Sequence, residues 1–254
     1  MDKLLDFSES VGIITGASSG FGRALALALN QRGARLVLSD INQAGLEQTI
    51  AALPQKQRAT PLIADVAKEQ SAIDAVTLAQ DTFSGLSFAV NNAGIAHPQG
   101  AIHEMTDEIY DSQFAVNVKG VGFGMKHQVK AMLANKNGHI LNVSSLAGLG
   151  GAPKGGAYSA AKHAVIGLTR TAAVEYARYG VRVNAICPFF SPTDIMNIEG
   201  LQSEQDKHKL GLGSPMKRIS TIDEIVNVMV LMLSPHNTYM NGQCIAVDGG
   251  VSAW

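Results

Sequence analysis

The sequence is poor in cysteine, and this bears on the compartment in which the protein works. Only Cys187 and Cys244 occur among the 254 residues. They lie too far apart in the sequence to match the spacing of a metal-binding or redox motif. Disulfide frameworks belong to oxidising compartments. We therefore expect two free thiols and a cytoplasmic protein.

Linkers, charge excess and long apolar runs are lacking as well. No Pro/Ser-rich stretch and no low-complexity segment divides the chain, so residues 1–254 are expected to form a single domain. Segment 1–6 has no hydrophobic signal core, and the longest apolar-rich run, 225–233, is too short to span a bilayer. The net charge of -1 argues against a nucleic-acid surface or a basic membrane patch.

Seven short apolar runs rich in β-branched residues alternate with longer helical patterns. They cover residues 11–15, 35–39, 59–63, 88–91, 139–143, 181–186 and 244–247. Runs without polar alternation suit strands that are buried on both faces, and right-handed crossovers through helices make such strands parallel. The sequence predicts an α/β fold: a doubly wound, seven-stranded parallel sheet of the Rossmann type with helices on both faces.

A glycine-rich turn directly follows the first predicted strand. It reads Thr15-Gly16-Ala17-Ser18-Ser19-Gly20-Phe21-Gly22 and leads into a helix rich in alanine and leucine. The backbone amides at the start of such a helix can face a pyrophosphate. Glycine-rich turns also occur as plain tight connections, but the position after the first strand of a doubly wound sheet favours a dinucleotide site.

Asp40 ends the second predicted strand, 18 residues after Gly22. A carboxylate at this place accepts hydrogen bonds from the ribose hydroxyls of NAD and repels the 2′-phosphate of NADP. The alternative is that Asp40 caps a helix that begins near Asn42. Asp65, after the third predicted strand, is placed either to bond the adenine or to cap the helix after Lys68. The preferred cofactor is NAD.

Tyr158 and Lys162 are four residues apart in a predicted helix, so their side chains lie on the same face. A free tyrosine titrates near about 10, and a neighbouring ammonium group favours the phenolate. Such a pair can exchange a proton with an alcohol or a ketone. On its own the pair is also common on ordinary helix surfaces.

Several motifs occur together and in order along the chain. They are Thr15-Gly-x-x-x-Gly-x-Gly22, Asn91-Asn92-Ala93-Gly94, Asn117-Val118-Lys119-Gly120, Ser145 thirteen residues before Tyr158, Lys162, Asn184-Ala185-Ile186-Cys187-Pro188 and Asp248-Gly249-Gly250. With this set, the chain resembles the classical short-chain dehydrogenases/reductases over essentially its whole length.

The resemblance implies a role for each catalytic candidate. Tyr158 would be the general acid/base, Ser145 would hydrogen-bond the substrate oxygen, and Lys162 would hold the nicotinamide ribose and lower the tyrosine pKa. Asn117 would complete a proton relay through a water bound to its backbone. Ordinary strand-end serines at 144 and 145, or a purely structural Asn117, are the alternatives.

The resemblance and the glycine turn together define the expected cofactor contacts. These are Gly16, Ser18, Ser19, Gly20, Phe21, Gly22, Asp40, Asp65, Val66, Asn92, Ala93, Gly94, Tyr158, Lys162, Pro188 and Thr193, the last holding the nicotinamide carboxamide. The histidines form no His-Glu-x-x-His or clustered set, so no metal site is expected.

One departure from the family pattern concerns the loop after Pro188. The family usually has glycine there, whereas this chain has Phe189 and Phe190. The loop beside the nicotinamide is therefore expected to be reshaped or to carry an aromatic wall. A substrate lid is expected at about 190–215. Its apolar residues, with Leu146 and Leu149, favour an apolar pocket, although they can equally pack on their own helix. Because Glu199, Gln202 and His97 could bind hydroxyl groups, a sugar remains an alternative substrate.

The sequence therefore predicts an NAD-dependent oxidoreductase that interconverts a secondary alcohol and a ketone on a mainly apolar small molecule. The alternatives are an NADPH-linked 3-oxoacyl-thioester (acyl carrier protein) reductase and a catalytically silent dinucleotide-binding scaffold. By resemblance, a homotetramer is expected, and the apolar faces of 108–134 and 157–177 fit it. Trp254 would pack against a neighbouring subunit or fray. No nucleic acid and no membrane are expected as partners.

Overall fold

The computed structural model describes residues 2–197 and 203–253. In these ranges, seven strands form one parallel sheet in the order β3-β2-β1-β4-β5-β6-β7. The strands are β1 (Val11–Thr15), β2 (Arg35–Asp40), β3 (Ala59–Ile63), β4 (Phe88–Asn91), β5 (Gly138–Val143), β6 (Val181–Pro188) and β7 (Cys244–Val247). The predicted Rossmann-type sheet is confirmed.

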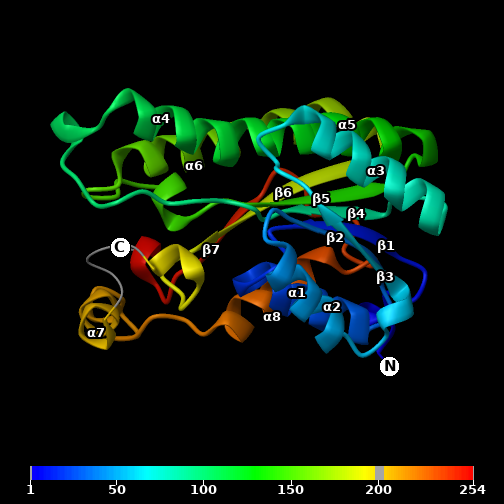
Figure 1. Ribbon diagram of the computed structural model, residues 1–254, viewed down its shortest axis with the longest axis horizontal. Helices are drawn as coiled ribbons and strands as arrows, with labels where there is room; N and C mark the ends of the chain where they lie inside the picture. The colour runs from blue at the N-terminus through cyan, green and yellow to red at the C-terminus, as the bar shows by residue number, and fades with distance from the viewer. Residues whose placement is uncertain (1, 198–202, 254) are drawn as a thin grey trace.

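Helices cover both faces of the sheet (Figure 1). One face carries α1 (Gly20–Gln31), α2 (Gln43–Ala52) and α8 (Ile222–Leu233), and the other carries α3 (Glu69–Phe83), α4 (Asp107–Phe114), α5 (Gly120–Asn135) and α6 (Gly156–Tyr176). The short helix α7 (Glu204–Leu212) lies apart from the sheet, at the end of the molecule where the C-terminus is found.

The sheet is held between two apolar cores, and this explains why its strands lack polar alternation. Ile13 and Ile14 are neighbours on β1 and both are almost fully buried. Ile14 packs into the core with α1 and α8, whereas Ile13 packs into the core with α3, α5 and α6. Burying a side chain of this size stabilises the fold by about 1.5–3 kcal/mol.

The strand order reverses at β1. Its neighbour on one side is β2, where Thr15 pairs with Ser39, and on the other side β4, where Ile14 pairs with Val90. Because the chain winds outward in both directions from this point, the loops after β1 and β4 separate and leave a crevice at the carboxyl ends of the strands.

The segment expected to carry one continuous apolar helical face, 108–134, is interrupted. A π-helical turn, Ala115–Lys119, separates α4 from α5, and the N–H of Gly120 donates to the carbonyl oxygen of Ala115. A π turn inserts one extra residue into the helix and changes the direction of the side chains that follow. Asn117 lies inside this turn and is fully buried.

Two helix boundaries show the residue types that favour them. Thr221 and Glu224 form a capping box at the start of α8. Gly180 ends the 3-10 turn after α6 with a φ of 80°.

Candidate active site

A cleft of about 490 Å³ opens where the crevice is expected. This is a usual size for a small-molecule site. Its walls come from the loops after β1, β2, β3 and β4 and from the segment after β6. The lining residues are Gly16, Ser18, Ser19, Gly20, Phe21, Asp40, Ile41, Ala64, Asp65, Val66, Asn92, Ala93, Gly94, Ile95, Ala96, Val116, Thr193, Asp194 and Ile195.

The glycine turn after β1 forms one end of the cleft. Gly16 has a φ of 67°, and a Cβ atom at Gly22 would lie 2.1 Å from the carbonyl oxygen of Gly16. Only glycine therefore permits this turn. Ser19 is the N-cap of α1 and makes no side-chain capping bond. Ser19, Gly20 and Phe21 line the cleft at the start of α1. The first amides of a helix have no intrahelical acceptor, an arrangement that suits a phosphate group.

Asp40 fastens the end of β2 to the glycine turn. Its Oδ2 accepts the N–H of Ser18 at 2.9 Å, and its Oδ1 accepts the N–H of Asn42 at 2.9 Å. It is not the N-cap of α2, because that role belongs to Asn42, whose Oδ1 accepts the N–H of Gly45. The carboxylate lines the cleft and keeps lone pairs free for further donors.

Asp65 also lines the cleft without capping a helix. Its Oδ1 accepts the N–H of Ala67 at 3.0 Å, whereas α3 begins at Glu69 with Lys68 as N-cap. The alternative role considered for Asp65 therefore does not apply.

The loop after β4 is tied to the loop after β1. The Nδ2 of Asn92 donates to the carbonyl oxygens of Thr15 and Gly16 at 2.8 and 3.1 Å. The hydroxyl of Thr15 accepts the backbone N–H groups of Asn92 and Ala93. These bonds hold the loops after β1 and β4, between which the crevice opens, at a fixed distance from each other.

Lys162 lies directly behind this wall. A Cβ atom at Gly94 would be 3.4 Å from the Nζ of Lys162 and 2.8 Å from the Oδ1 of Asn117. The lysine is 2 % exposed, and burial lowers its pKa to about 8. Its Nζ donates to the carbonyl oxygen of Val143 at 2.9 Å and lies 5.5 Å from the centre of the Tyr158 ring.

Tyr158 does not have the lowered pKa that the sequence led us to expect. Burial raises the pKa of Tyr158 to about 12, and the hydroxyl of Ser145 beside it has a smaller, lowering effect. The ammonium of Lys162 faces the ring of Tyr158 and donates to the carbonyl oxygen of Val143. In this state the phenol is neutral at ordinary pH.

The two strand-end serines have separate functions. The Oγ of Ser144 is buried and donates to the carbonyl oxygen of Lys162 at 2.9 Å. The Oγ of Ser145 accepts the N–H of Ala147 at 3.2 Å and faces Tyr158. Of the two hydroxyls, therefore, that of Ser145 lies beside the tyrosine.

Asn117 is bound to the loop after β4 through both ends of its amide. Its Oδ1 accepts the N–H of Ile95 at 3.0 Å and its Nδ2 donates to the carbonyl oxygen of Ile95 at 2.9 Å. Ile95 itself lines the cleft. The π turn thus brings Asn117, Lys162 and the wall of the cleft together.

The loop after Pro188 begins by continuing the pairing of β6 with β7. Pro188 pairs with Val247, and the N–H of Phe189 continues the ladder by donating to the carbonyl oxygen of Val247 at 3.1 Å. Phe189 and Phe190 pack edge to face, with ring centres 4.8 Å apart. Thr193 lines the cleft, and a Cβ atom at Gly20 would lie 3.2 Å from its methyl group.

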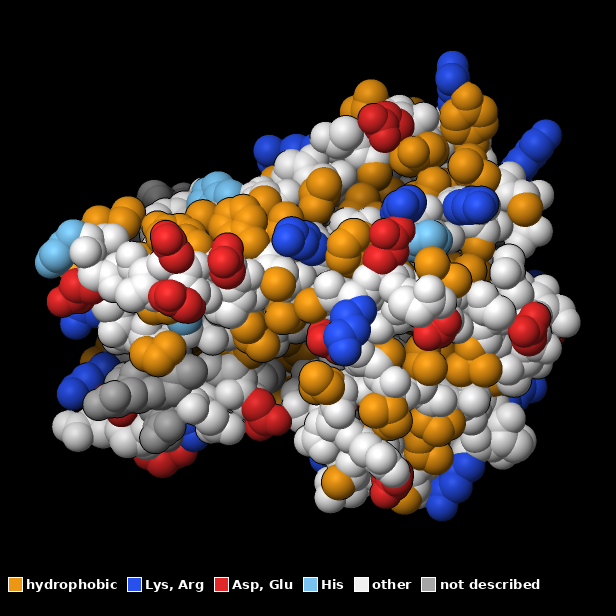
Figure 2. Space-filling model, turned by 45° about the horizontal axis from the view of Figure 1, so that its top comes forward, with side chains coloured by type: hydrophobic (Ala, Val, Ile, Leu, Met, Phe, Trp, Pro, Cys, Tyr) orange, Lys and Arg blue, Asp and Glu red, His pale blue; other side chains and the backbone are white. Residues whose placement is uncertain are grey.

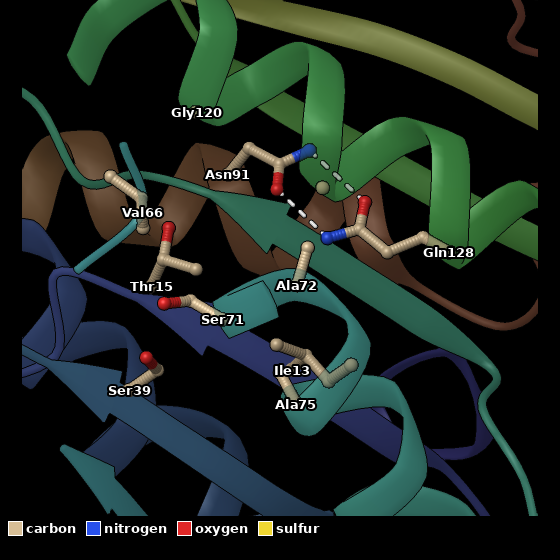
Figure 3. A pocket seen from close by; sticks show the side chains of 11 residues that line it. Ile13, Thr15, Ser39, Val66, Ser71, Ala72, Ala75, Asn91, Gly120 and Gln128 are labelled. Atoms are coloured by element: carbon tan, nitrogen blue, oxygen red, sulfur yellow. Dashed lines mark hydrogen bonds between the residues drawn. The ribbon is translucent and has the colours of Figure 1, made fainter. Parts of the chain in front are cut away.

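A second cavity, of about 20 Å³, lies below the cleft between α3, α5 and the sheet (Figure 3). Asn91 and Gln128 face each other there through two reciprocal hydrogen bonds of 3.1 and 2.8 Å. A space of this size holds at most one water molecule.

Ile198, Glu199, Leu201 and Gln202 lie outside the described residues. His97 is buried, and its Nδ1 lies 2.7 Å from the carbonyl oxygen of Pro98. Within residues 2–197 and 203–253, no cluster of three potential metal ligands occurs, and no helix is long and apolar enough to cross a bilayer.

Comparison with known proteins gives the same picture at the level of the whole chain. Residues 16–252 match the family model described as enoyl-(acyl carrier protein) reductase. Levodione reductase of Leifsonia aquatica is 35% identical over 256 aligned positions, which cover 97% of this chain and 96% of that protein. Cyclohexanol dehydrogenase of Acinetobacter sp. strain SE19 is 34% identical over 100% of both chains.

The chain belongs to the short-chain dehydrogenase/reductase family. The crystal structure of levodione reductase matches this classical short-chain dehydrogenase/reductase with a TM-score of 0.93 at 34% identity, covering 97% of this chain and 99% of that one. The structure of NAD+-bound xylitol dehydrogenase matches it with a TM-score of 0.89 at 29% identity over 96% and 99% of the two chains.

This short-chain dehydrogenase/reductase is an enzyme that interconverts an alcohol and a ketone, as the sequence predicted. The alternative of a silent scaffold therefore loses its support. An acyl-thioester reductase has less support than an alcohol dehydrogenase, because the curated relatives compared above are named for levodione and cyclohexanol.

Most predicted cofactor contacts of the short-chain dehydrogenase/reductase line the cleft. The exceptions are Gly22 in the first turn of α1, Lys162 behind Gly94, Tyr158 on α6 beside Ser145, and Pro188 at the end of β6. The cleft also includes residues that no motif had indicated, namely Ile41, Ala64, Ile95, Ala96, Val116, Asp194 and Ile195. Most of these residues directly precede or follow a motif residue. That adjacency is the signal by which the sequence could have indicated them.

Proposed function

We propose that this enzyme uses NAD to interconvert a secondary alcohol and a ketone on an alicyclic, mainly apolar ring, with Tyr158 as the general acid/base. One observation supports this proposal most strongly. Lys162 and Asn117 lie directly behind Gly94 in the wall of a dinucleotide-sized cleft, and Asp40 lines the same cleft at the end of β2.

The residues of the cleft fit a dinucleotide. The free amides at the start of α1 would hold the pyrophosphate, Asp40 the adenosine ribose, Asp65 and Val66 the adenine, and Thr193 the carboxamide. When bound, the nicotinamide supplies a carbon that accepts a hydride from the carbinol carbon or returns it. Asp40 favours NAD, because a 2′-phosphate would stand next to its carboxylate.

The proton is handled by this chain's own side chains. Tyr158 is neutral in the protein alone and would donate its proton to the substrate oxygen during ketone reduction. Ser145 would hold that oxygen. For alcohol oxidation Tyr158 must first lose its proton, and the nearby Lys162 ammonium would stabilise the phenolate. Asn117 would connect Lys162 to the solvent through a backbone-bound water.

The expected substrate follows from the walls and from the relatives. Among the similar proteins are cyclohexanol dehydrogenase and cis-4-hydroxycyclohexanecarboxylate dehydrogenase, both named for six-membered rings. Ile195 lines the cleft, and the edge-to-face pair of Phe189 and Phe190 follows β6. These apolar groups, together with a lid at about 190–215, would enclose a ring and exclude water from it.

We also propose that each chain forms one domain, that four chains form a homotetramer, and that the enzyme works in the cytoplasm. The face made by α3, α4, α5 and α6 carries apolar side chains among charges of both signs (Figure 2). On this side Phe114 of α4 is 36% exposed and Val174 of α6 is 83% exposed. The two cysteines are unpaired, which suits a reducing compartment.

Initial rates on a substrate panel test the proposed function. The panel contains cyclohexanols, 3-hydroxyacyl thioesters, steroids and polyols, each with NAD and with NADP. The proposal predicts the highest kcat/KM for a cyclohexanol with NAD. Turnover confined to hydroxyacyl thioesters with NADP would replace it with the acyl-thioester reductase.

A further inference from the structure

Gln113 is a buried glutamine that no motif or comparison marks as functional. It lies on α4, one turn before Asn117, and is 0% exposed. Its Oε1 accepts the Nδ2 of Asn117 at 2.8 Å. In the described part of the chain, its own Nε2 has no partner.

The bond from Asn117 to Gln113 completes the hydrogen bonding of the Asn117 amide. One N–H of its Nδ2 is used by the carbonyl oxygen of Ile95, and its Oδ1 accepts the N–H of Ile95. The second N–H is the one that Gln113 accepts. The N–H and the carbonyl oxygen of Ile95 determine which end of the amide is oxygen, and the bond to Gln113 holds the remaining N–H and with it the tilt of the amide.

The orientation of this amide affects the site on the other side of the wall. Asn117 Oδ1 and Lys162 Nζ lie on the same side of Gly94, since a Cβ atom there would meet both of them. Gly94 and Ile95 both line the cleft. A tilted Asn117 would therefore shift the backbone against which Lys162 packs.

Stability does not explain a glutamine at this place. A fully buried amide with one hydrogen bond and an unpartnered donor is costly, and an apolar side chain of equal length would avoid that cost. The bond to Asn117 is what an apolar residue cannot make.

We propose that Gln113 is a positioning residue that fixes the amide of Asn117 and, through Gly94, the place of Lys162 in the proton relay. This inference rests on the proposed function, which gives Asn117 and Lys162 their roles. It adds a residue on α4 to the proposed catalytic residues, which otherwise lie on α6, after β5 and in the π turn.

Two substitutions separate the acceptor of Gln113 from its size. Gln113→Met keeps the length and removes the acceptor, and we expect kcat to fall about tenfold with an unchanged KM. Gln113→Glu keeps an acceptor oxygen, because burial raises the pKa of the carboxyl and keeps it protonated, and should restore most of the turnover.

Gln128→Met is the matched control. Gln128 is a buried glutamine of α5 that exchanges two hydrogen bonds with Asn91 (Figure 3). Its removal leaves both ends of the Asn91 amide with fewer partners, so the Tm should fall while kcat stays near the native value. Gln113→Met should show the opposite pattern, a nearly native Tm with a lowered kcat.

Crystal structures of the cofactor-free native and Gln113→Met proteins give a second readout that does not depend on activity. We expect the Asn117 amide at hydrogen-bond distance from Ile95 and Gln113 in the native protein and displaced from Ile95 in the variant. An unchanged Asn117 with native kcat in Gln113→Met would overturn the inference. Inactivity of the native enzyme on every alcohol would instead refute the proposed function, while the Asn117 orientation would still decide whether Gln113 fixes it.

Discussion

The hydroxyl of Ser144 donates to the carbonyl oxygen of Lys162 at 2.9 Å, and the Nζ of the same lysine donates back to Val143, the residue before Ser144. The end of β5 therefore holds Lys162 by its backbone and by its side chain. The ammonium is placed before any cofactor binds. Ser145, the next residue, is left to face Tyr158.

Substitution of the two serines should give different results. Ser145→Ala removes the hydroxyl beside Tyr158 and should lower kcat by about 10²-fold or more with little change in Tm, since such donors act mainly on the transition state. Ser144→Ala removes a buried bond of about 1 kcal/mol and should lower the Tm by about 2–4 °C. Thermal unfolding and steady-state kinetics on both variants check this. A larger loss of kcat in Ser144→Ala would reverse the assignment.

Asp40→Asn should relax the choice of nucleotide. The substitution keeps the size of the side chain and removes the charge that repels a 2′-phosphate. Two charges at about 4 Å interact by about 4 kcal/mol at an effective dielectric constant of 20. We expect the ratio of kcat/KM for NAD over NADP to fall at least about tenfold, measured with one alcohol. The account of Asp40 would be wrong if the native enzyme already preferred NADP.

His139 should make the folded protein sensitive to acid. It is buried in β5, its Nε2 accepts from the Nδ2 of Asn184 at 2.9 Å, and burial lowers its pKa to about 3. Unfolding restores the ordinary pKa of about 6.5. The unfolded chain thus binds a proton that the native chain excludes, so stability is full above about pH 6.5 and falls as the pH drops towards 3.

Urea unfolding at pH 7 and pH 5 measures this effect. The native protein should lose about 2 kcal/mol from His139 between these two values. His139→Gln should remove that part of the difference, whatever its effect at pH 7. The exposed His103→Gln is the control and should leave the pH dependence unchanged. Equal losses in native and His139→Gln proteins would show that His139 titrates normally.

The sheet was predictable because local composition determines it. The runs that form β1, β3, β4 and β7 have the predicted bounds. In the central strands β1 and β4, burial on both faces leaves an unbroken apolar signal. β6 extends to Pro188, two residues beyond the prediction, because Cys187 and Pro188 pair with Ala246 and Val247 of β7. That pairing partner lies far away in the sequence and leaves no local signal.

The sequence could predict those site residues that directly follow a predicted strand, because the position of the strand end places them in the site. The glycine turn and Asp40 lie at strand ends that the sequence locates. The π turn was not predictable, because the apolar spacing of 108–134 fits an unbroken helix equally well. Gln113 and the raised pKa of Tyr158 depend on which loops and helices surround them, and only the folded chain determines that.

The kcat of Tyr158→Phe tests the central claim most directly. The substitution removes only the phenolic oxygen, and a general acid/base contributes about 10²–10⁴-fold. With a cyclohexanol and NAD, we predict a kcat at least about 10²-fold below that of the native enzyme, and NAD binding by calorimetry that is nearly unchanged. Native turnover in Tyr158→Phe, with NAD bound normally, would contradict the account.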